Sequence, residues 1–464
     1  MKRLLQIRNI GDALRTVELQ RFAAALIVVG SIMAAAWIPG ISPAIHRTST
    51  TVNYSATLCP SSLGGTTSVS LPTKGLLIRS VKPKSLTSYR SRTSYLPSTT
   101  FPTYIQGNPG TAIAFNSTGT GSQAALLCDG GGESQWFVGG SAGLTSSDLL
   151  DVVNSGLGSA NVVIYPYTPK GPLPAVALSV GANSESQVSV GALAPGENSV
   201  ALNVVTQTGR VTSFLLDHRK RGLSDLGSSF VASTAAPTNK IYIGGLINSI
   251  NHSSPAGTTQ VVRLLVPGGI DANISTTVYT NDNSFAPIGL AQTTISHQKV
   301  LDITLPTPST SLPYGIVITS DQPLLASVLT TLGSGSSDFA WANSLSQLSN
   351  DSRSPVLLNL AGEKPTICFM GSSISAKITW STTTGARGSV VVSGADLQSW
   401  SAPSALSAIS IQPLNKSPLY ASAILASGSS MSYLPLASHE IQSGSTLPTL
   451  DIRTLAHAAL HSAH

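Results

Sequence analysis

The sequence predicts an all-β protein, with an N-terminal transmembrane helix followed by tandem β-sandwich domains of the immunoglobulin-like type. Two observations predict the sandwiches. Turn-forming residues interrupt the chain roughly every 8–12 residues after residue 45, and the runs between them alternate apolar with polar residues, as in Leu301-Asp302-Ile303. This period of two places successive side chains on opposite faces of a strand. No stretch after residue 45 carries the apolar repeat of a helix over three turns, which excludes α/β architectures.

The composition excludes two broad classes of protein. Only 10% of the 464 residues are charged and 5% are aromatic, whereas 41% are hydrophobic. A soluble cytosolic domain carries roughly 25% charged residues, so this composition excludes that class. A disordered chain combines low hydrophobicity with high net charge, and the formal net charge here is only +6. The length accommodates roughly three domains of ordinary size.

An apolar segment near the N-terminus predicts where most of the chain lies. Residues 22–41 contain no charged residue, and their number matches the roughly 20 residues that cross a bilayer as a helix. Residues 1–21 hold five cations against two acids, so we expect them in the cytoplasm and the bulk of the chain outside it, at the cell membrane. The alternative is a signal peptide cleaved near Ser42-Pro43-Ala44, so the sequence alone leaves open whether this segment is removed.

Charge is distributed unevenly along the predicted extracytoplasmic part. Between Glu18 and Asp129 the sequence has no carboxylate, yet it holds seven cations after the apolar segment. We therefore interpret six of them as candidate anion-binding residues: Lys74, Arg79, Lys82, Lys84, Arg90 and Arg92. The expected partner is the membrane itself, an anionic cell-wall polymer or another envelope protein; the alternative is an ordinary solvated surface. No nucleic-acid recognition motif is present, and no nucleic acid is expected as a partner.

The three cysteines predict one disulfide. Cys59 and Cys128 bracket the basic stretch, and an exported protein keeps such bonds. Cys368 lies in the apolar run Ile367-Cys368-Phe369 and is expected to be a buried free thiol. The spacing of Cys and His residues fits no metal site, and neither a metal nor a cofactor is predicted.

Internal similarity divides the extracytoplasmic part into domains. Three stretches open with an aromatic strand, namely Trp136-Phe137-Val138-Gly139-Gly140, Ile241-Tyr242-Ile243-Gly244-Gly245 and, more loosely, Phe339-Ala340-Trp341-Ala342. Their spacing suits sandwiches of about 100 residues. The predicted domains are a basic β-rich domain (42–130), three β-sandwich repeats (131–235, 236–335 and 336–436) and a flexible tail (437–464). The alternative is that any chain of short strands aligns with itself.

Within these domains the sequence predicts several finer features. Residues 85–102, rich in Ser, Thr and Pro, are expected to form a long loop, and residues 314–319 and 324–329 a pair of strands. The aromatics that open the repeats, Trp136, Tyr242 and Trp341, are interpreted as core residues. Their alternative role is a platform on which sugar rings stack.

Two motifs raise the possibility of catalysis. Gly139-Gly140-Ser141-Ala142-Gly143 matches the nucleophile elbow of serine hydrolases, but that elbow needs a helix after the serine, and a strand-like run follows here. Glycines at this position are better explained by positive φ angles or a β-bulge after an aromatic strand, as at Gly244-Gly245. In Asp217-His218, neighbouring side chains on a strand face opposite ways, so Asp217 is not expected to orient His218. The interpretation of this pair is a solvated strand end, with an anion-binding edge as the alternative.

The order of these features resembles a known family. The chain resembles actinobacterial secreted proteins of an uncharacterised domain-of-unknown-function family. The features that carry this resemblance are the anchor, the Cys-containing segment, Cys128, the Trp136 run, a strand ending at Asn154, and Asp217-His218-Arg219. That resemblance implies an envelope location and a β-rich fold but no reaction. We therefore expect a non-catalytic, membrane-anchored envelope protein with a structural, scaffolding or protein-binding role. The alternative is a surface protein that binds a cell-wall polymer or carbohydrate, and the remote alternative is a hydrolase using Ser141.

Overall fold

The structure, a computed structural model, is all-β. It describes residues 49–54, 56–106, 112–117, 123–222, 224–234, 236–248, 258–332, 338–348, 356–359, 364–403, 405–427, 430–437 and 441–446. Residues 50–445 form one compact unit. In the described ranges the α-helix is limited to the single turn α2 (Val190–Leu193), and no helix there is long and apolar enough to cross a membrane. The anchor predicted at residues 22–41 lies outside the described residues.

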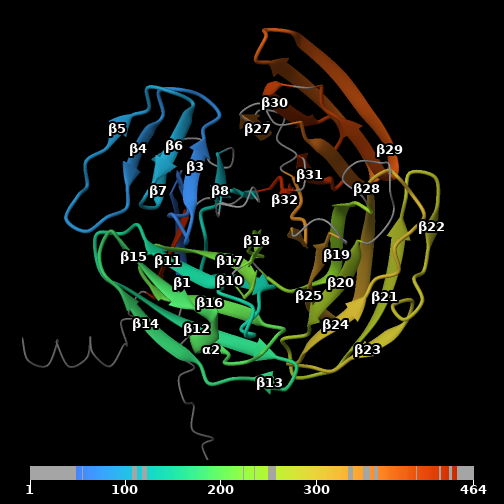
Figure 1. Cartoon of the computed structure of the whole chain (residues 1–464), viewed down its shortest axis with the longest axis horizontal. Coiled ribbons are helices and arrows are strands. Elements are labelled where there is room, and N and C mark those ends of the chain that lie inside the picture. Colours follow the sequence, from blue (N-terminus) through green and yellow to red (C-terminus); the bar gives the residue numbers. More distant parts are fainter. Residues whose placement is uncertain are drawn as a thin grey trace, which may run out of the picture. The chain divides into compact units, whose positions relative to one another are not determined.

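Strands of the compact unit group into four sandwich-like modules, which follow the sequence colours in Figure 1. The N-terminal module has two four-stranded sheets, ordered β2–β7–β4–β5 and β6–β3–β8–β9. Its strands are β2 (Ala56–Cys59), β3 (Thr66–Ser70), β4 (Leu77–Ser80), β5 (Tyr89–Arg90), β6 (Tyr95–Thr99), β7 (Thr103–Gln106), β8 (Ile113–Ser117) and β9 (Gln123–Leu127). The sheets enclose Val69, Ile78, Ile105 and the two predicted half-cystines.

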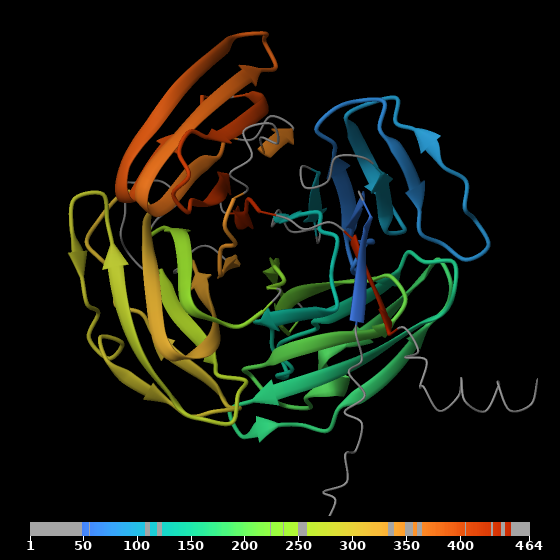
Figure 2. The ribbon, with the colours of Figure 1, turned by 180° about the vertical axis from the view of Figure 1, so that it is seen from behind.

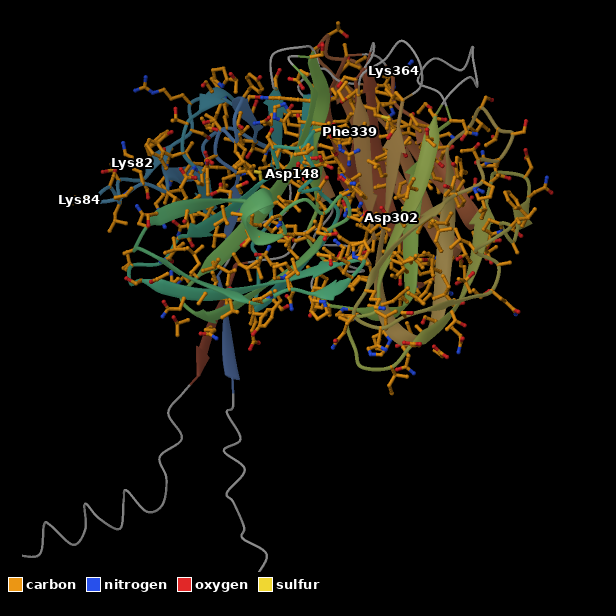
Figure 3. The ribbon with its side chains drawn as sticks, turned by 60° about the horizontal axis from the view of Figure 1, so that its bottom comes forward. Lys82, Lys84, Asp148, Asp302, Phe339 and Lys364 are labelled. Atoms are coloured by element: carbon orange, nitrogen blue, oxygen red, sulfur yellow. A yellow bond between two sulfur atoms is a disulfide. The ribbon has the colours of Figure 1, made fainter. Side chains whose placement is uncertain are left out.

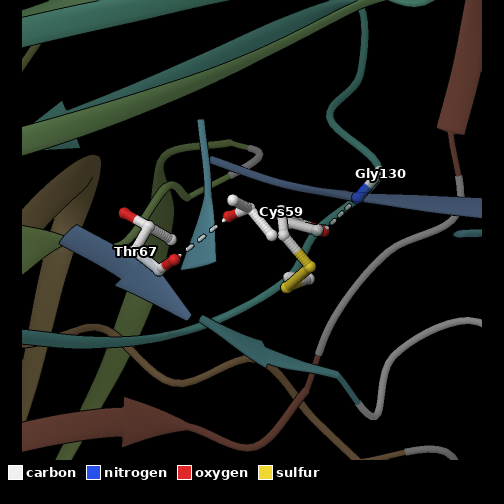
Figure 4. Close-up of a disulfide and its surroundings, with 6 residues drawn as sticks. Cys59, Thr67 and Gly130 are labelled. Atoms are coloured by element: carbon white, nitrogen blue, oxygen red, sulfur yellow. Dashed lines mark hydrogen bonds between the residues drawn. A yellow bond between two sulfur atoms is a disulfide. The ribbon is translucent and has the colours of Figure 1, made fainter. Parts of the chain in front are cut away.

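Those half-cystines form the predicted disulfide. Cys59 and Cys128 are bonded at a sequence separation of 69, and both are fully buried. Two backbone hydrogen bonds between Leu58 and Asp129, of 2.9 and 3.0 Å, lie beside the bond. Figure 4 shows it close to Thr67 and Gly130. The disulfide therefore joins the first strand of the N-terminal module to the segment that leaves it.

Module 1 also has two sheets, ordered β10–β16–β12–β13 with β14 beside β12, and β15–β11–β17–β18. On β12 the buried Ala160, Val162 and Ile164 alternate with more exposed residues, as a period of two requires. Its strands are β10 (Ser134–Val138), β11 (Leu149–Asn154), β12 (Ala160–Thr168), β13 (Gly171–Pro172), β14 (Val176–Val180), β15 (Ser184–Ser189), β16 (Ala201–Thr208), β17 (Val211–Arg221) and β18 (Ser224–Val231).

Module 2 is organised around one long strand, β25 (Tyr314–Thr331), whose first half pairs with β19 and β21 and whose second half pairs with β20 and β26. The predicted pair at 314–319 and 324–329 is thus a single strand that serves two sheets. The other strands are β19 (Thr238–Leu246), β20 (Thr259–Leu265), β21 (Ala272–Tyr279), β22 (Ser284–Phe285), β23 (Thr293–Ile295), β24 (Val300–Thr304) and β26 (Phe339–Asn343).

Module 3 repeats this arrangement with two long strands, visible in orange in Figure 2. Strand β28 (Thr366–Thr382) pairs with β29 (Arg387–Ser401) along nearly its whole length, and on its other side with β30 and β31. The remaining strands are β27 (Val356–Asn359), β30 (Leu406–Pro413), β31 (Tyr420–Ser427) and β32 (Ser430–Pro435). Separately, β1 (Ser49–Tyr54) pairs with β33 (Ile441–Thr446), which lies in the segment predicted to be a flexible tail.

The last strand of each module contacts the last strand of another. β9 contacts β18, β18 contacts β26, β26 contacts β32, and β32 contacts β9. Hydrogen bonds connect these strands directly: Trp341 N–H donates to Ser229 Oγ at 3.0 Å, and Ala125 N–H donates to Ser432 Oγ at 3.1 Å. The four modules are therefore linked in a closed cycle of contacts through their final strands.

Two sequence predictions are corrected by the pairing. Phe339-Ala340-Trp341 was expected to open the third repeat, but β26 pairs with β25, with Trp341 opposite Leu329, and so completes module 2. The predicted boundary between 335 and 336 consequently falls inside that module. The loop predicted at residues 85–102 contains β5 and β6, because each finds a neighbouring strand, β4 and β3 respectively.

Candidate functional site

The six cations predicted to bind an anion divide into two groups. Lys74, Lys82, Lys84, Arg90 and Arg92 are exposed on the N-terminal module, whereas Arg79 is half-buried. Large apolar side chains are exposed in the same stretch, with exposed fractions of 55% for Leu86, 52% for Tyr89, 42% for Tyr95 and 37% for Phe101. We call this surface the basic-aromatic strip, with the members Lys82, Lys84, Leu86, Tyr89, Arg90, Arg92, Tyr95 and Phe101.

The strip is exposed because its strands lie at sheet edges. β5 is the edge strand of one sheet of the N-terminal module and β6 is the edge strand of the other. Val81 N–H donates to Pro102 O at 2.8 Å, which places the loops at the two ends of the strip side by side. The Lys82 Nζ lies 5.7 Å from the centre of the Phe101 ring, within the range of a cation–π contact. In Figure 3 the labelled Lys82 and Lys84 lie at the outer margin of the molecule.

One loop of the strip is fixed by module 1. The side-chain amide of Asn183 donates to Lys82 O at 2.5 Å and to Ser85 O at 2.8 Å. Lys84, between these two carbonyls, has a φ of 62°, in the left-handed region that non-glycine residues rarely adopt. The loop that carries Lys82 and Lys84 is thus held in one conformation by contacts of its backbone, and both ammonium groups remain exposed.

Arg79 does not belong to the exposed surface. Its guanidinium donates to Asn183 Oδ1 and, at 2.8 Å, to Ser155 O, both in module 1. It also lies 4.3 Å from the centre of the Tyr104 ring. Burial lowers the pKa of Arg79, and the charge of Arg210 adds to that effect. Arg79 therefore connects the N-terminal module to module 1 instead of offering a free charge to an anion.

Asp217 is not the solvated strand end that the sequence predicted. It is fully buried, and Arg219 contacts both of its carboxylate oxygens, at 3.0 and 2.7 Å. Trp341 Nε1–H donates to the same carboxylate at 2.8 Å from module 2, which is why the group is buried. Burial and the neighbouring charge of Asp217 raise the pKa of Asp148 well above its ordinary value. The expectation that Asp217 does not orient His218 is confirmed, because its partners are Arg219 and Trp341.

His218 instead lies in a row of polar groups that the sequence did not reveal. Its Nδ1 lies 3.0 Å from Ser147 Oγ, and its Nε2 lies 3.1 Å from Asp225 Oδ1. Ser147 is exposed, and none of these three residues lines any of the three cavities named below. No sequence signal joins them, because they come from one loop and two separate strands.

Ser141, the candidate nucleophile, has a local structural role. Its backbone N–H donates to Asp148 Oδ2 at 2.7 Å, and its Oγ accepts the N–H of Gly143 at 3.1 Å. The preceding Gly140 has a φ of 87°, and Gly245 in module 2 has a φ of 86°. Of the two predicted explanations, positive φ is confirmed at both glycines, and it accounts for the glycine-rich motif without an elbow.

A buried arginine that the sequence analysis missed joins modules 1 and 2. Arg263 on β20 pairs with Asp302 at 2.8 Å, while its Nη1 donates to Gly140 O at 2.5 Å and to Val200 O at 3.1 Å. Its guanidinium also lies 4.9 Å from the centre of the Trp341 ring. The only signal in the sequence is a cation inside the apolar run Val261-Val262-Arg263-Leu264-Leu265.

The cavities lined by described residues of the modules include three candidates for a binding site. One, of about 20 Å³, is lined by residues of all four modules, Leu126, Phe214, Ser344 and Pro435 among them. Another, of about 610 Å³, is an open polar depression of module 2 beside Asn273 and Asp321. The third, of about 380 Å³, is lined by residues of modules 1 and 2.

The repeated aromatics are mostly core residues, as predicted. Trp136 and Trp341 are buried, with exposed fractions of 8% and 1%. Tyr242 is half-buried and stacks on Tyr420 of module 3, with ring centroids 4.0 Å apart. Trp136 has a second role, because it also lines the cavity of about 380 Å³.

Comparison with known proteins identifies the family. A model described as a family of unknown function, DUF5719, matches residues 106–397, well over half of the chain. The chain belongs to this family. The resemblance to a domain-of-unknown-function family is thereby confirmed. No curated protein matches the chain.

One solved structure matches the chain only weakly. It is described as a tetra-tandem repeat in the extending region of a large adhesion protein, with 12% sequence identity and a TM-score of 0.11. The match covers 82% of this chain and 93% of the other.

Proposed function

We propose that the protein is a non-catalytic component of the cell envelope, anchored in the membrane by residues 22–41. Its immunoglobulin-like modules form an extracytoplasmic scaffold that attaches to an anionic polymer of the cell surface through the basic-aromatic strip. The linked modules support a structural role, because side chains such as Arg79, Arg263 and Trp341 hold one module to the next.

The observation that carries this proposal is the charge of the strip. Lys82, Lys84, Arg90 and Arg92 are exposed, and no carboxylate occurs in sequence between Glu18 and Asp129. Cations without interspersed acids raise the local concentration of a polyanion and steer it to the surface. The ligand carries phosphate groups, which occur both along an anionic wall polymer and at the surface of a lipid bilayer.

The roles of the candidate catalytic groups support the non-catalytic part of the proposal. Ser141 and Asp217 are engaged in contacts that hold the backbone and the modules together. The Ser147–His218–Asp225 row lies beside an exposed loop and outside the three cavities described above. Enzyme sites are concave, with the reacting groups converging on a pocket.

Retention on purified cell wall tests the attachment. The variant carries Lys82→Ser, Lys84→Ser, Arg90→Ser and Arg92→Ser. Its matched control removes four exposed cations elsewhere, with Lys299→Ser, Lys364→Ser, Lys377→Ser and Arg387→Ser. We expect the native chain and the control to be retained at low salt and released at 1 M salt, where the Debye length is about 3 Å. The strip variant should already be lost at low salt.

Further arms of the experiment separate the sources of phosphate and test the location. Retention on wall stripped of its anionic polymer would contradict the attachment, as would retention of the strip variant equal to that of the control. Binding to anionic phospholipid vesicles but not to wall would assign the ligand to the bilayer. Protease treatment of intact cells checks the topology, because residues 50–464 should be digested from outside.

A further inference from the structure

The cavity of about 380 Å³ lies where modules 1 and 2 meet, and we call it the aromatic groove. Module 1 contributes Trp136, Tyr167 and Asn203, and module 2 contributes Ile270, Gln322 and Pro323. None of the residues that line it is Asp, Glu, Lys, Arg or His. A site without any charged side chain fits a neutral ligand, because a charged one would lose its hydration without compensation.

The aromatic wall of the groove is built by cross-strand register. In module 1 Asn203 on β16 lies opposite Trp136 on β10 and opposite Tyr165 on β12. Residues opposite one another share a face of the sheet, and Tyr167 lies two residues beyond Tyr165 on that same face. The other face is the one that buries Phe137, Leu202 and Val204 in the core. Three aromatic side chains therefore gather on the outer face of module 1.

These rings differ in how much surface they offer. Trp136 packs on Leu265, Val300 and Leu325 of module 2 and keeps only 8% of its surface exposed. Tyr167 lies beside it, with centroids 5.8 Å apart and the rings tilted by 36°, and is half-buried. Tyr165 is 37% exposed. The row thus runs from the anchored Trp136 through Tyr167, which lines the groove, to Tyr165, which lies beyond the residues that line it.

Two amides supply polar groups inside this apolar setting. The Oδ1 of Asn203 accepts a hydrogen bond from the hydroxyl of Ser134 at 2.8 Å. Its Nδ2 donates no hydrogen bond to any residue that the structure describes. Gln322 lies where β25 passes from its partner β21 to its partner β20, and its side chain likewise makes no hydrogen bond to any residue that the structure describes. Both amide groups are thus available for hydrogen bonds to a bound molecule.

We propose that the aromatic groove binds a neutral sugar unit of a polysaccharide. A sugar ring has an apolar C–H face, which stacks on an aromatic ring, and a rim of hydroxyls, which bond to amides; the groove offers both. Ile270, 65% exposed at its edge, adds apolar contact area. The groove is a location for the carbohydrate-binding alternative that the sequence left open. It goes beyond the proposed attachment, because the groove is uncharged and distinct from the strip.

Titration with neutral tetrasaccharides tests the groove. The probes are maltotetraose, cellotetraose and chitotetraose, followed by calorimetry and by tryptophan fluorescence, since Trp136 lies in the groove. At least one probe should bind saturably, with an affinity unaffected by 1 M salt. Tyr167→Ala should weaken it about tenfold, the equivalent of about 1.4 kcal/mol. Gln322→Ala should weaken it about fivefold through the lost hydrogen bond.

The control is Phe285→Ala, which removes a 38% exposed aromatic ring elsewhere on module 2 and should leave the affinity unchanged. Gln322→Ala keeps the test valid where Tyr167→Ala fails to fold. The proposal is overturned where no tetrasaccharide binds at millimolar concentration, where both groove variants bind as the native chain does, or where decaproline binds in place of the sugars. The strip variant should keep its sugar binding, so failure of the attachment and failure of the groove are separable.

Discussion

Trp341 donates its indole N–H to the Asp217 carboxylate over 2.8 Å, and this bond joins β26 of module 2 to β17 of module 1. Neither residue exposes more than 1% of its surface. The same carboxylate pairs with Arg219, whose guanidinium lies 4.3 Å from the centre of the Phe339 ring on β26. One carboxylate therefore organises the contact between two modules, and its burial is tolerated because Arg219 and Trp341 both donate hydrogen bonds to it.

Trp341→Phe should lower the free energy of unfolding by about 1.5–3 kcal/mol. The variant keeps an aromatic ring but removes a hydrogen bond to a buried charged group. Urea denaturation measures the change. Trp400→Phe is the matched control, since Trp400 is only partly buried on β29, and it should change stability much less. Equal losses in the two variants would contradict a special role for the Trp341–Asp217 bond.

Arg263→Met should destabilise the protein by about 3–5 kcal/mol, because Asp302 would lose its partner beside a buried surface. Replacing both partners, with Arg263→Met and Asp302→Leu, should recover much of that loss, since no uncompensated charge remains. A double-mutant cycle from denaturation midpoints measures the coupling. Simple addition of the two single losses would show that the pair is not coupled.

Loss of the disulfide should lower stability by about 4 kcal/mol in the loop-entropy model, because a bond across 69 residues restricts the unfolded chain. The variant carries Cys59→Ser and Cys128→Ser, and thermal unfolding follows the effect. Cys368→Ser serves as a control that leaves the bond in place. Reducing agent should destabilise the native chain and the control alike, and a native chain insensitive to reduction would count against the prediction.

Stability should fall as pH rises from about 4 to about 6.5. Burial raises the pKa of Asp338 from 3.8 to about 6, so the folded state favours the protonated carboxyl. A raised acid pKa means that the folded protein holds a proton which the unfolded chain releases, and folding is progressively penalised between the two pKa values. The difference corresponds to about 3 kcal/mol.

Asp338→Asn tests this assignment. The amide oxygen still accepts the N–H of Met431, which bonds to Asp338 at 2.9 Å in the native chain. The variant should therefore be more stable than the native chain at pH 7 and should lose the decline between pH 4 and 6.5. Denaturation at a series of pH values gives the profile. An unchanged slope in the variant would assign the effect to other carboxyls.

Local patterns made much of the β-structure predictable. The strand expected to end at Asn154 is β11, which ends at that residue, and the alternating run Leu301-Asp302-Ile303 lies in β24. A period of two is read from neighbouring residues, so no knowledge of the partner strand is needed. The partner of a strand, by contrast, cannot be read from its own sequence. Phe339–Trp341 has the pattern of a strand, but its assignment to β25 depends on residues that the pattern does not contain.

The residues of the candidate site were likewise predictable only where the signal is local in sequence. The exposed cations of the strip were predictable, because a stretch without carboxylates is visible in sequence. Arg79 was misassigned, since its partners Ser155 and Asn183 lie 76 and 104 residues further along the chain. Arg263 and the Ser147–His218–Asp225 row were missed for a similar reason: contacts between modules and between separate strands define them.

The closed cycle of contacts among the final strands determines the order in which the modules gain their neighbours during synthesis. Ala125 on β9 bonds to Ser432 on β32, a partner 307 residues later. A ribosome adds roughly 5–20 residues each second, so β9 waits about 15–60 s for the strand that covers it. Its neighbour in the cycle, β18, is made much sooner. The first module to be synthesised thus waits longest for its last neighbour, and throughout that interval it depends on its own disulfide and core to remain folded.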